Sequence, residues 1–185
     1  MSRTAGSTGV ETRERILAAA RALFAERGYA GTSIRDLAEA LGFTKAALYY
    51  HFPGKAEILH ALVEPLLEEL DAISDRADRE PDAAMRDYVR LLAARAPGVI
   101  GLISDPSAKA DVGERFDAQR RFRSLERKLA SDGGVLGVRC ALGAAHFAVF
   151  STLSARARAG EPPELSDDEI ERIIRAALAA WDAAA

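Results

Sequence analysis

The chain has 185 residues, a formal net charge of −3, a hydrophobic fraction of 49% and a charged fraction of 29%, which is ordinary globular composition. Its single cysteine, Cys140, excludes an intrachain disulfide framework and a cysteine metal cluster, and we expect it to be a small core residue. We find no run of about eighteen apolar residues and no apolar leader segment, so we expect a cytoplasmic protein without a membrane span.

The charge is distributed unevenly along the chain. Residues 1–55 carry eight Lys or Arg residues against five Asp or Glu residues, so this part has a formal charge of +3 and the remainder has −6. A mildly basic segment on an acidic body suits local contact with DNA phosphates. A solvated surface of mixed charge would give the same asymmetry, so the charge distribution alone does not indicate a function.

Apolar residues recur at helical spacing throughout, and no alternating pattern predicts a strand. We predict an all-α fold of about nine helices. Pro65 is expected to kink the fourth helix, because a proline inside a helix removes a backbone donor and clashes with the preceding turn. The predicted helices cover about residues 12–27, 34–40, 45–50, 55–79, 82–95, 97–103, 106–131, 135–159 and 166–182.

Residues 32–55, TSIRDLAEALGFTKAALYYHFPGK, have the pattern of two short helices joined by a tight turn. Ser33 and Asp36 have the spacing of a capping box, and Thr44 can cap the second helix. Gly42 stands where the turn needs a positive φ, which is cheap only for glycine. A helix-turn-helix of this kind places its second helix in the major groove of DNA.

The order and spacing of residues over 12–62 resemble the DNA-binding domain of the tetracycline-repressor (TetR) family of bacterial transcriptional regulators. With the resemblance we expect a flexible arm over 1–11, a three-helix DNA-binding domain over 12–55, and a helical effector-binding and dimerisation domain over 56–185. The residues that carry the resemblance are Phe24, Gly28, Tyr29, Thr32, Ser33, Leu48, Tyr49, Tyr50, His51, Phe52 and Lys55.

The second helix of the motif and its flanks carry the predicted DNA contacts. Thr44 can bind a phosphate while it caps its helix, and Lys45 lies at the helix start, where it can reach a base edge or a phosphate. The resemblance implies phosphate contacts for His51 and Lys55. Packing against the first helix is the alternative for the two tyrosines. The predicted set is Arg35, Thr44, Lys45, Ala46, Ala47, Tyr49, Tyr50, His51 and Lys55.

Small residues recur every three or four positions along 135–159, which forms a seam that lets another helix approach closely. Ser166 and Glu169 have the spacing of a second capping box before the last helix. The resemblance implies a four-helix dimer interface built from the last two helices of each subunit, and packing of the seam inside the monomer is the alternative. The predicted interface residues are Gly137, Ala141, Ala144, Ala148, Ser151, Ala155, Ile170, Ile174, Ala177 and Trp181.

The resemblance also implies a ligand cavity among the helices after Lys55. His146 is a polar group in an apolar run, where a neutral imidazole could hydrogen-bond a ligand. Ordinary core packing is the alternative for each candidate, because apolar helical stripes are normally buried. The candidate lining residues are Leu62, Leu66, Tyr88, Leu92, Ile100, Ile103, Phe116, Phe122, His146, Phe147 and Phe150.

Together these features predict a ligand-responsive DNA-binding transcriptional regulator. We expect a homodimeric repressor that binds a palindromic operator in double-stranded DNA and is released by a small, largely apolar effector. A DNA-binding dimer without an effector is the alternative. An α-helical enzyme is disfavoured, because the sequence has no nucleophile motif, no HExxH and no glycine-rich phosphate loop. We therefore predict no catalytic residue, no metal and no cofactor.

Overall fold

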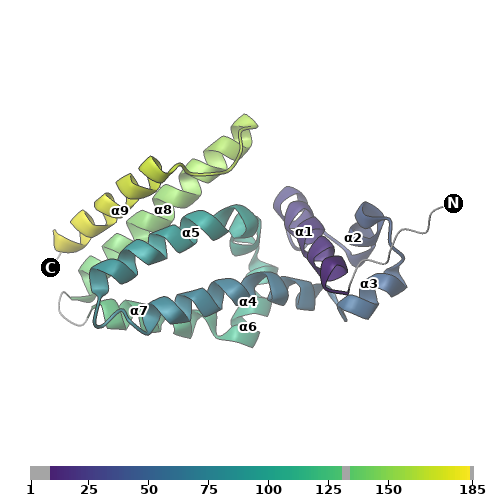
Figure 1. Cartoon of the computed structure of the whole chain (residues 1–185), viewed down its shortest axis with the longest axis horizontal. Coiled ribbons are helices and arrows are strands. Elements are labelled where there is room, and N and C mark those ends of the chain that lie inside the picture. Colours follow the sequence, from purple (N-terminus) through teal and green to yellow (C-terminus); the bar gives the residue numbers. More distant parts are fainter. Residues whose placement is uncertain (1–8, 131–133, 184–185) are drawn as a thin grey trace. The chain divides into compact units, whose positions relative to one another are not determined.

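The computed structural model describes residues 9–130 and 134–183, and all regular elements in these two ranges are α-helices (Figure 1). The all-α prediction is confirmed. The nine helices within the described ranges are α1 Gly9–Arg27, α2 Ile34–Leu41, α3 Lys45–His51, α4 Lys55–Ser74, α5 Pro81–Ser104, α6 Pro106–Phe116, α7 Ala118–Leu129, α8 Val135–Ala159 and α9 Asp167–Asp182.

Two predicted helix boundaries in the middle of the chain are wrong. Helix α5 runs through Pro97, where a new helix was expected, because a helix can continue through a proline at the loss of one backbone hydrogen bond. The helix expected over 106–131 is instead interrupted at Asp117, whose φ of 48° and ψ of 42° are left-handed. The two errors cancel in the number of helices.

The chain forms two compact units, and each combines segments that are distant in the sequence. The first unit consists of Met1–Glu64 and Gly98–Arg115, and the second of Pro65–Pro97 and Phe116–Ala185. The resemblance led us to expect a contiguous DNA-binding domain that ends at residue 55. In the structure, the end of α5 and all but the last residue of α6 belong to the same unit as α1, α2 and α3.

The core of the first unit is built by side chains that recur at helical spacing in α1 to α4. Phe24 of α1, Leu37 of α2 and Leu48 of α3 are fully buried, and burial of a side chain of this size stabilises a fold by roughly 1.5–3 kcal/mol. The ring of Phe24 also packs edge-on against Tyr29, with 5.3 Å between centroids. The other fully buried apolar residues of these helices and their flanks are Ile16, Ala20, Phe52, Ile58 and Leu59.

The caps predicted around the first turn of the motif are confirmed. The amide of Ser33 donates to Oδ2 of Asp36 at 2.7 Å, and the amide of Asp36 donates back to the Ser33 hydroxyl at 3.2 Å. Gly42 has a φ of 66°, and the Thr44 hydroxyl accepts the amide of Ala47 at 3.1 Å. These bonds fix where α2 ends and α3 begins.

In the second unit, α8 and α9 lie side by side (Figure 1) and contact each other along their length. Val149 and Leu153 of α8 and Ile174 of α9 are fully buried. The second predicted capping box is confirmed, since Ser166 and Glu169 bond each other reciprocally at the start of α9. The same Glu169 carboxylate pairs with Arg156 of α8 at 2.7 Å, which joins the two helices at one end.

Among the described helices, α8 alone is long and apolar enough to cross a membrane by length and composition, with a mean hydropathy of 1.4. The core helix of a soluble protein meets the same criteria, so one such helix is weak evidence for a membrane span. Part of its apolar surface is buried within this chain, because its inner face packs on α7 and α9.

Candidate nucleic-acid interface

Helix α3 is anchored on one side and exposed on the other. Leu48 within it and Phe52 directly after it are fully buried, so the helix cannot rotate without emptying the core. Tyr49 is 50% exposed and Tyr50 is 86% exposed, which are high values for aromatic side chains. The remaining predicted contact residues on this exposed side are Thr44, Lys45, Ala46 and Ala47, and all four are exposed.

Arg35 lies on the neighbouring helix α2 and is also accessible to solvent. Its Nε donates to Glu39 at 2.7 Å, one helical turn further on, and this hydrogen bond raises the pKa of the guanidinium group. An exposed pair of this kind contributes little to stability. Arg35 can therefore exchange Glu39 for a phosphate without disturbing the core.

Lys55 has a role that the sequence did not predict. Its Nζ donates to the carbonyls of Tyr29 at 2.8 Å and Thr32 at 3.0 Å, and it lies 4.2 Å from the centroid of the Tyr29 ring. The ammonium group thus satisfies carbonyls in the loop between α1 and α2. A phosphate contact by Lys55 stays a prediction, and the geometry gives the residue a structural role first.

His51 is half-buried at the end of α3, and its backbone is held by α1. The guanidinium of Arg13 donates to the carbonyl of His51 at 2.8 Å and lies 4.0 Å from the centroid of the Phe52 ring. Arg15 lies over the ring of Phe43 at 5.1 Å. The structural role of these arginines was not predicted from the sequence, where the available signal was their position just before the buried stripe of α1.

The loop between α1 and α2 is also bound by a residue that directly precedes α6. The amide of Ala30 donates to Oδ2 of Asp105 at 2.8 Å, while Oδ1 of the same carboxylate accepts the amide of Ser107 at 2.8 Å. These backbone hydrogen bonds, that of Ala30 foremost, lower the pKa of Asp105. One carboxylate therefore caps α6 and positions the loop that leads into α2.

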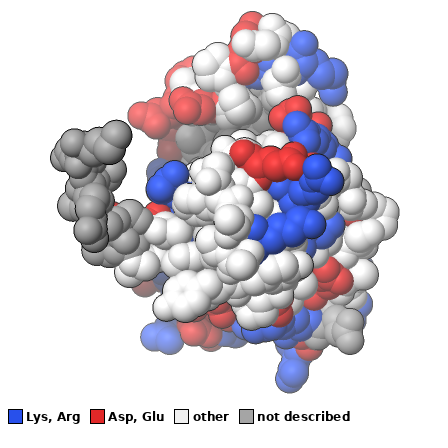
Figure 2. All heavy atoms as spheres, turned by 90° about the vertical axis from the view of Figure 1, so that its right-hand side faces the viewer, with Lys and Arg blue, Asp and Glu red and all other residues white. Residues whose placement is uncertain are grey.

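Figure 2 looks onto the end of the first unit that carries α2 and α3. Lys and Arg side chains form separate patches there, Asp and Glu side chains lie among them, and uncharged atoms cover much of the centre. The visible face is therefore of mixed charge. Contacts from individual side chains, more than a broad positive field, would have to bind a polyanion there.

Four of the predicted ligand-lining residues come together in the second unit. The hydroxyl of Tyr88 lies 2.9 Å from Nδ1 and 3.2 Å from Nε2 of His146. The His146 ring stacks on Phe150 with 5.7 Å between centroids, and Phe122 packs edge-on against it at 6.0 Å. Burial lowers the pKa of His146 and raises that of Tyr88, so both groups are neutral in a closely packed aromatic cluster.

The other candidate lining residues do not join this cluster as a group. Phe147 lies on another face of α8 and is 77% exposed, because one residue along a helix turns the side chain by about 100°. Leu62 is buried in the first unit, and Leu92 is buried on α5. Leu66 lies on α4 and Phe116 ends α6, and the side chains of Ile100 and Ile103 lie outside the described part of the chain.

The predicted dimer residues divide into two groups. Gly137, Ala141, Ile174, Ala177 and Trp181 are buried between helices of this chain, so for them the structure favours the packing inside the monomer that the sequence left open. Ala144, Ser151 and Ala155 are exposed on α8, and so is Ala148 in part, while Ile170 on α9 is half-buried.

Large apolar side chains and the cysteine also lie on the outer side of α8. Leu136 is 68% exposed and Phe147 is 77% exposed, which leaves two sizeable apolar groups in solvent on one helix. Cys140 is exposed as well, so its expected core position is wrong. The helix is apolar on more than one face, and α7 and α9 can cover only the inner one.

Comparison with known proteins identifies the first part of the chain. Residues 16–62 match the family model of bacterial regulatory proteins of the tetR family. The HTH-type transcriptional regulator TtgR of Pseudomonas putida is 40% identical over 72 residues. Over these residues the chain belongs to the TetR family. The matched segment contains α2, α3, the loops around them and the buried stripe of α1.

The sequence similarity to TetR-family relatives is confined to part of each protein. The chain spans 34% of the length of TtgR, and the match covers 39% of this chain. The regulator EthR of Mycolicibacterium smegmatis is 32% identical over 93 residues, which are 48% of this chain and 43% of that protein. Most of this sequence similarity therefore does not extend into the body of the chain after α4.

Solved structures extend the likeness over nearly the whole chain. The TetR-family transcriptional regulator PfmR of Thermus thermophilus is 28% identical, with a TM-score of 0.55 over 91% of this chain and 97% of that one. A regulatory protein of the tetR family from Rhodococcus has a TM-score of 0.66 over 97% and 98% of the two chains, at 19% identity. That second likeness shows the fold alone.

Proposed function

We propose that this protein is a dimeric transcriptional regulator that represses its target by binding a palindromic operator in double-stranded DNA through α3. The observation that supports this most strongly is the division of α3 into a buried anchor and an exposed surface. Leu48 and Phe52 hold the helix in the core, and its outer side presents Lys45 together with two exposed tyrosines. Relatives of this domain are named HTH-type transcriptional regulators and repressors.

The exposed side of α3 has the chemistry for both kinds of DNA contact. Thr44, Tyr49 and Tyr50 can donate hydroxyl groups to phosphate oxygens, which position a protein on the duplex. Lys45 at the helix start can reach base edges, and the small side chains of Ala46 and Ala47 allow the helix to approach thymine methyl groups closely. We therefore assign sequence reading to Lys45, Ala46 and Ala47, and backbone contacts to the hydroxyl groups and Arg35.

Selection from random DNA duplexes tests this function. The full-length protein should enrich an inverted repeat, and Lys45→Gln should change which bases are enriched in each half of it. Lys109→Gln, an exposed lysine on α6, is the matched control that should leave the enriched sequence unchanged. A selection that enriches no inverted repeat, or an enriched sequence that Lys45→Gln leaves intact, would contradict the proposal.

Dimerisation is proposed through the outer side of α8. Ala144, Ser151 and Ala155 are small and exposed there, and Phe147 stands among them as a large apolar side chain in solvent. A second copy would cover this surface, and small side chains would let the two helices approach closely. The two-fold symmetry of such a dimer could place its two recognition helices about 34–36 Å apart, which is one turn of DNA.

An apolar effector is proposed to bind by opening the cluster of Tyr88, Phe122, His146 and Phe150. The hydrogen bond between Tyr88 and His146 provides a donor and an acceptor that a ligand could take over. Such a ligand changes the affinity for DNA only as far as its own affinity differs between the DNA-binding state and the released state of the protein. A change in DNA affinity of about 5–150-fold is typical. A metabolite screen that reads both melting temperature and operator affinity tests this. A DNA-binding dimer without effector is the second candidate, and it would give no compound that shifts both.

A further inference from the structure

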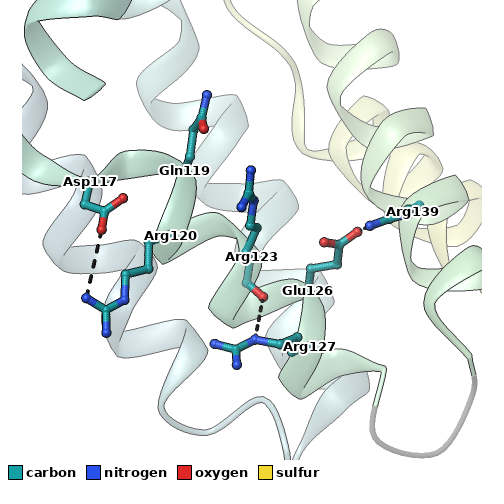
Figure 3. Close-up of a pocket in the computed structure, with 7 residues that line it drawn as sticks. All are labelled: Asp117, Gln119, Arg120, Arg123, Glu126, Arg127 and Arg139. Carbon is teal, nitrogen blue, oxygen red and sulfur yellow. Dashed lines mark hydrogen bonds and ion pairs between the residues drawn. The ribbon is translucent and has the colours of Figure 1, made fainter. Parts of the chain in front are cut away.

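A groove of about 340 Å³ on the second unit is lined almost entirely by charged side chains (Figure 3). It lies along α7 and the start of α8, and it shares no lining residue with the aromatic cluster or with the proposed DNA contacts. The lining residues are Asp117, Gln119, Arg120, Arg123, Glu126, Arg127 and Arg139.

The groove contains more positive charge than its own carboxylates neutralise. Glu126, which is nearly buried, pairs with Arg139 and raises the pKa of that guanidinium group. Asp117 reaches Arg120 at 4.0 Å, and both side chains are largely exposed. These are the two acidic lining residues among four arginines, so two guanidinium groups remain in excess.

Arg123 and Arg127 provide that excess. The Nε of Arg127 donates to the backbone carbonyl of Arg123 at 3.4 Å, and neither guanidinium has a carboxylate partner among the residues that the structure describes (Figure 3). Arg120, Arg123 and Arg127 follow one another at spacings of three and four residues, so they share one side of α7. Like charges at this spacing repel each other in the absence of an anion.

The start of α7 adds to the positive character of the groove. Asp117 precedes this 12-residue helix in a left-handed conformation, and its side chain makes no capping hydrogen bond to the first turn. The helix N-terminus therefore keeps its partial positive charge beside Arg120. Non-glycine residues in the left-handed region are uncommon, and among the described residues Asp117 is the single case.

We propose that this groove is a binding site for a small molecule that carries two or more negative charges close together, a phosphate ester or a polycarboxylate. Guanidinium groups bind both through paired, charge-assisted hydrogen bonds, and two free guanidinium groups match a dianion. The volume lies at the lower end of the range of small-ligand sites. The proposal does not depend on DNA binding, and it assigns to the body a ligand class different from the apolar effector.

Isothermal titration calorimetry of the full chain with pyrophosphate and with citrate tests the site. Both titrations are run at constant ionic strength, with sodium chloride as the matched salt. We expect saturable binding below about 1 mM for at least one probe, and the stronger probe identifies the phosphate or the carboxylate class. Arg123→Gln and Arg127→Gln should each weaken binding by about tenfold, the size expected for a lost charge-assisted hydrogen bond.

Two further variants separate a site from a general charge effect. Arg175→Gln removes one exposed arginine from α9, outside the groove, and should leave the affinity within about twofold. Asp117→Asn keeps a residue type that tolerates the left-handed conformation and removes a negative charge from the groove, so affinity should rise several-fold. The proposal is overturned if neither probe binds at about 1 mM, if the three arginine variants behave alike, or if Asp117→Asn weakens binding.

Discussion

The hydroxyl of Tyr29 donates a hydrogen bond to Oδ2 of Asp111 at 2.7 Å, across 82 residues of sequence. Tyr29 lies in the loop before α2 and Asp111 lies on α6, both within the first unit. The amide of the next residue, Ala30, is bound by Asp105 at 2.8 Å. The path of the chain into the helix-turn-helix is therefore set by two carboxylates of a distant segment.

Replacing Asp105 should destabilise the first unit. Asp105→Ala leaves the amides of Ala30, Ser107 and Ala108 without their acceptor, and loss of a helix cap of this kind typically costs about 1 kcal/mol. Asp105→Asn should lower the free energy of unfolding by less, because its single amide oxygen can still accept a hydrogen bond either from Ala30 or from the start of α6. Urea unfolding followed by circular dichroism measures the difference, and equal stability of wild type and Asp105→Ala would contradict this role.

The same carboxylate predicts a dependence on pH. Because the pKa of Asp105 is lowered in the folded state, the stability that it contributes is complete above the unfolded pKa of about 3.9 and is lost as the pH falls through the lower folded value. The free energy of unfolding should therefore fall less steeply below about pH 4 in Asp105→Asn than in the wild type.

Lys55 and Lys45 should respond differently to the same substitution. Lys55→Met removes the donor to two carbonyls and should lower the free energy of unfolding by about 1.5–3 kcal/mol, the size found for hydrogen bonds to charged groups. Lys45→Met, at an exposed position, should change it by less than about 0.5 kcal/mol.

DNA binding at varied salt completes this comparison. Arg35→Met, which removes a proposed backbone contact, should lower the slope of log affinity against log salt by about one unit. Lys55→Met should leave the slope unchanged once the affinity is corrected for the unfolded fraction. A stable Lys55→Met protein with a reduced slope would show instead that Lys55 contacts phosphate, as the sequence resemblance implies.

His146 should make the second unit sensitive to mild acid. Burial lowers its pKa in the folded state, so below about pH 6.5 the unfolded chain binds more protons and the free energy of unfolding falls as the pH decreases. His146→Gln should reduce this dependence between about pH 6.5 and 5. Tyr88→Phe is the control: it should lower stability by about 1 kcal/mol at every pH and keep the slope, because the imidazole remains buried.

Phe147 should be required for dimerisation and dispensable for folding of the monomer. Phe147→Glu places a charge on the proposed contact surface of α8, and sedimentation should show a shift toward monomer at micromolar concentration. Because the side chain is 77% exposed, the helical content should not change. Val10→Glu, at a position that is 72% exposed on α1, is the control and should leave the dimer intact. A wild-type monomer would refute the proposed contact directly.

The local signals in the sequence were sufficient for the helix-turn-helix. Ser33, Gly42 and Thr44 act on their immediate neighbours, so capping and φ preferences determine their geometry without reference to the rest of the fold. Pro97 and Asp117 were misread because both are exceptions to local preference. A proline lies inside α5 and an aspartate has a left-handed φ, and local preference predicts neither.

Contacts between distant segments were the part of the site that the sequence did not reveal. The Lys55 ammonium points to carbonyls in the loop between α1 and α2, and the carboxylates of Asp105 and Asp111 come from beyond the contiguous motif. Nothing in the periodicity of this segment distinguishes these two carboxylates from other surface charges. Likewise, the seam on α8 was visible as a pattern, but its division into buried and exposed residues depends on where α7 and α9 pack.

The discontinuity of the first unit bears on how such regulators can be recombined. A head excised at the end of the family match, residue 62, would carry Tyr29 and Ala30 without the carboxylates that bind them. A chimera that transplants this head onto the body of another regulator would inherit a loop whose acceptors belong to the discarded protein. The transferable module is therefore Met1–Glu64 together with Gly98–Arg115, and a working hybrid has to exchange both stretches at once.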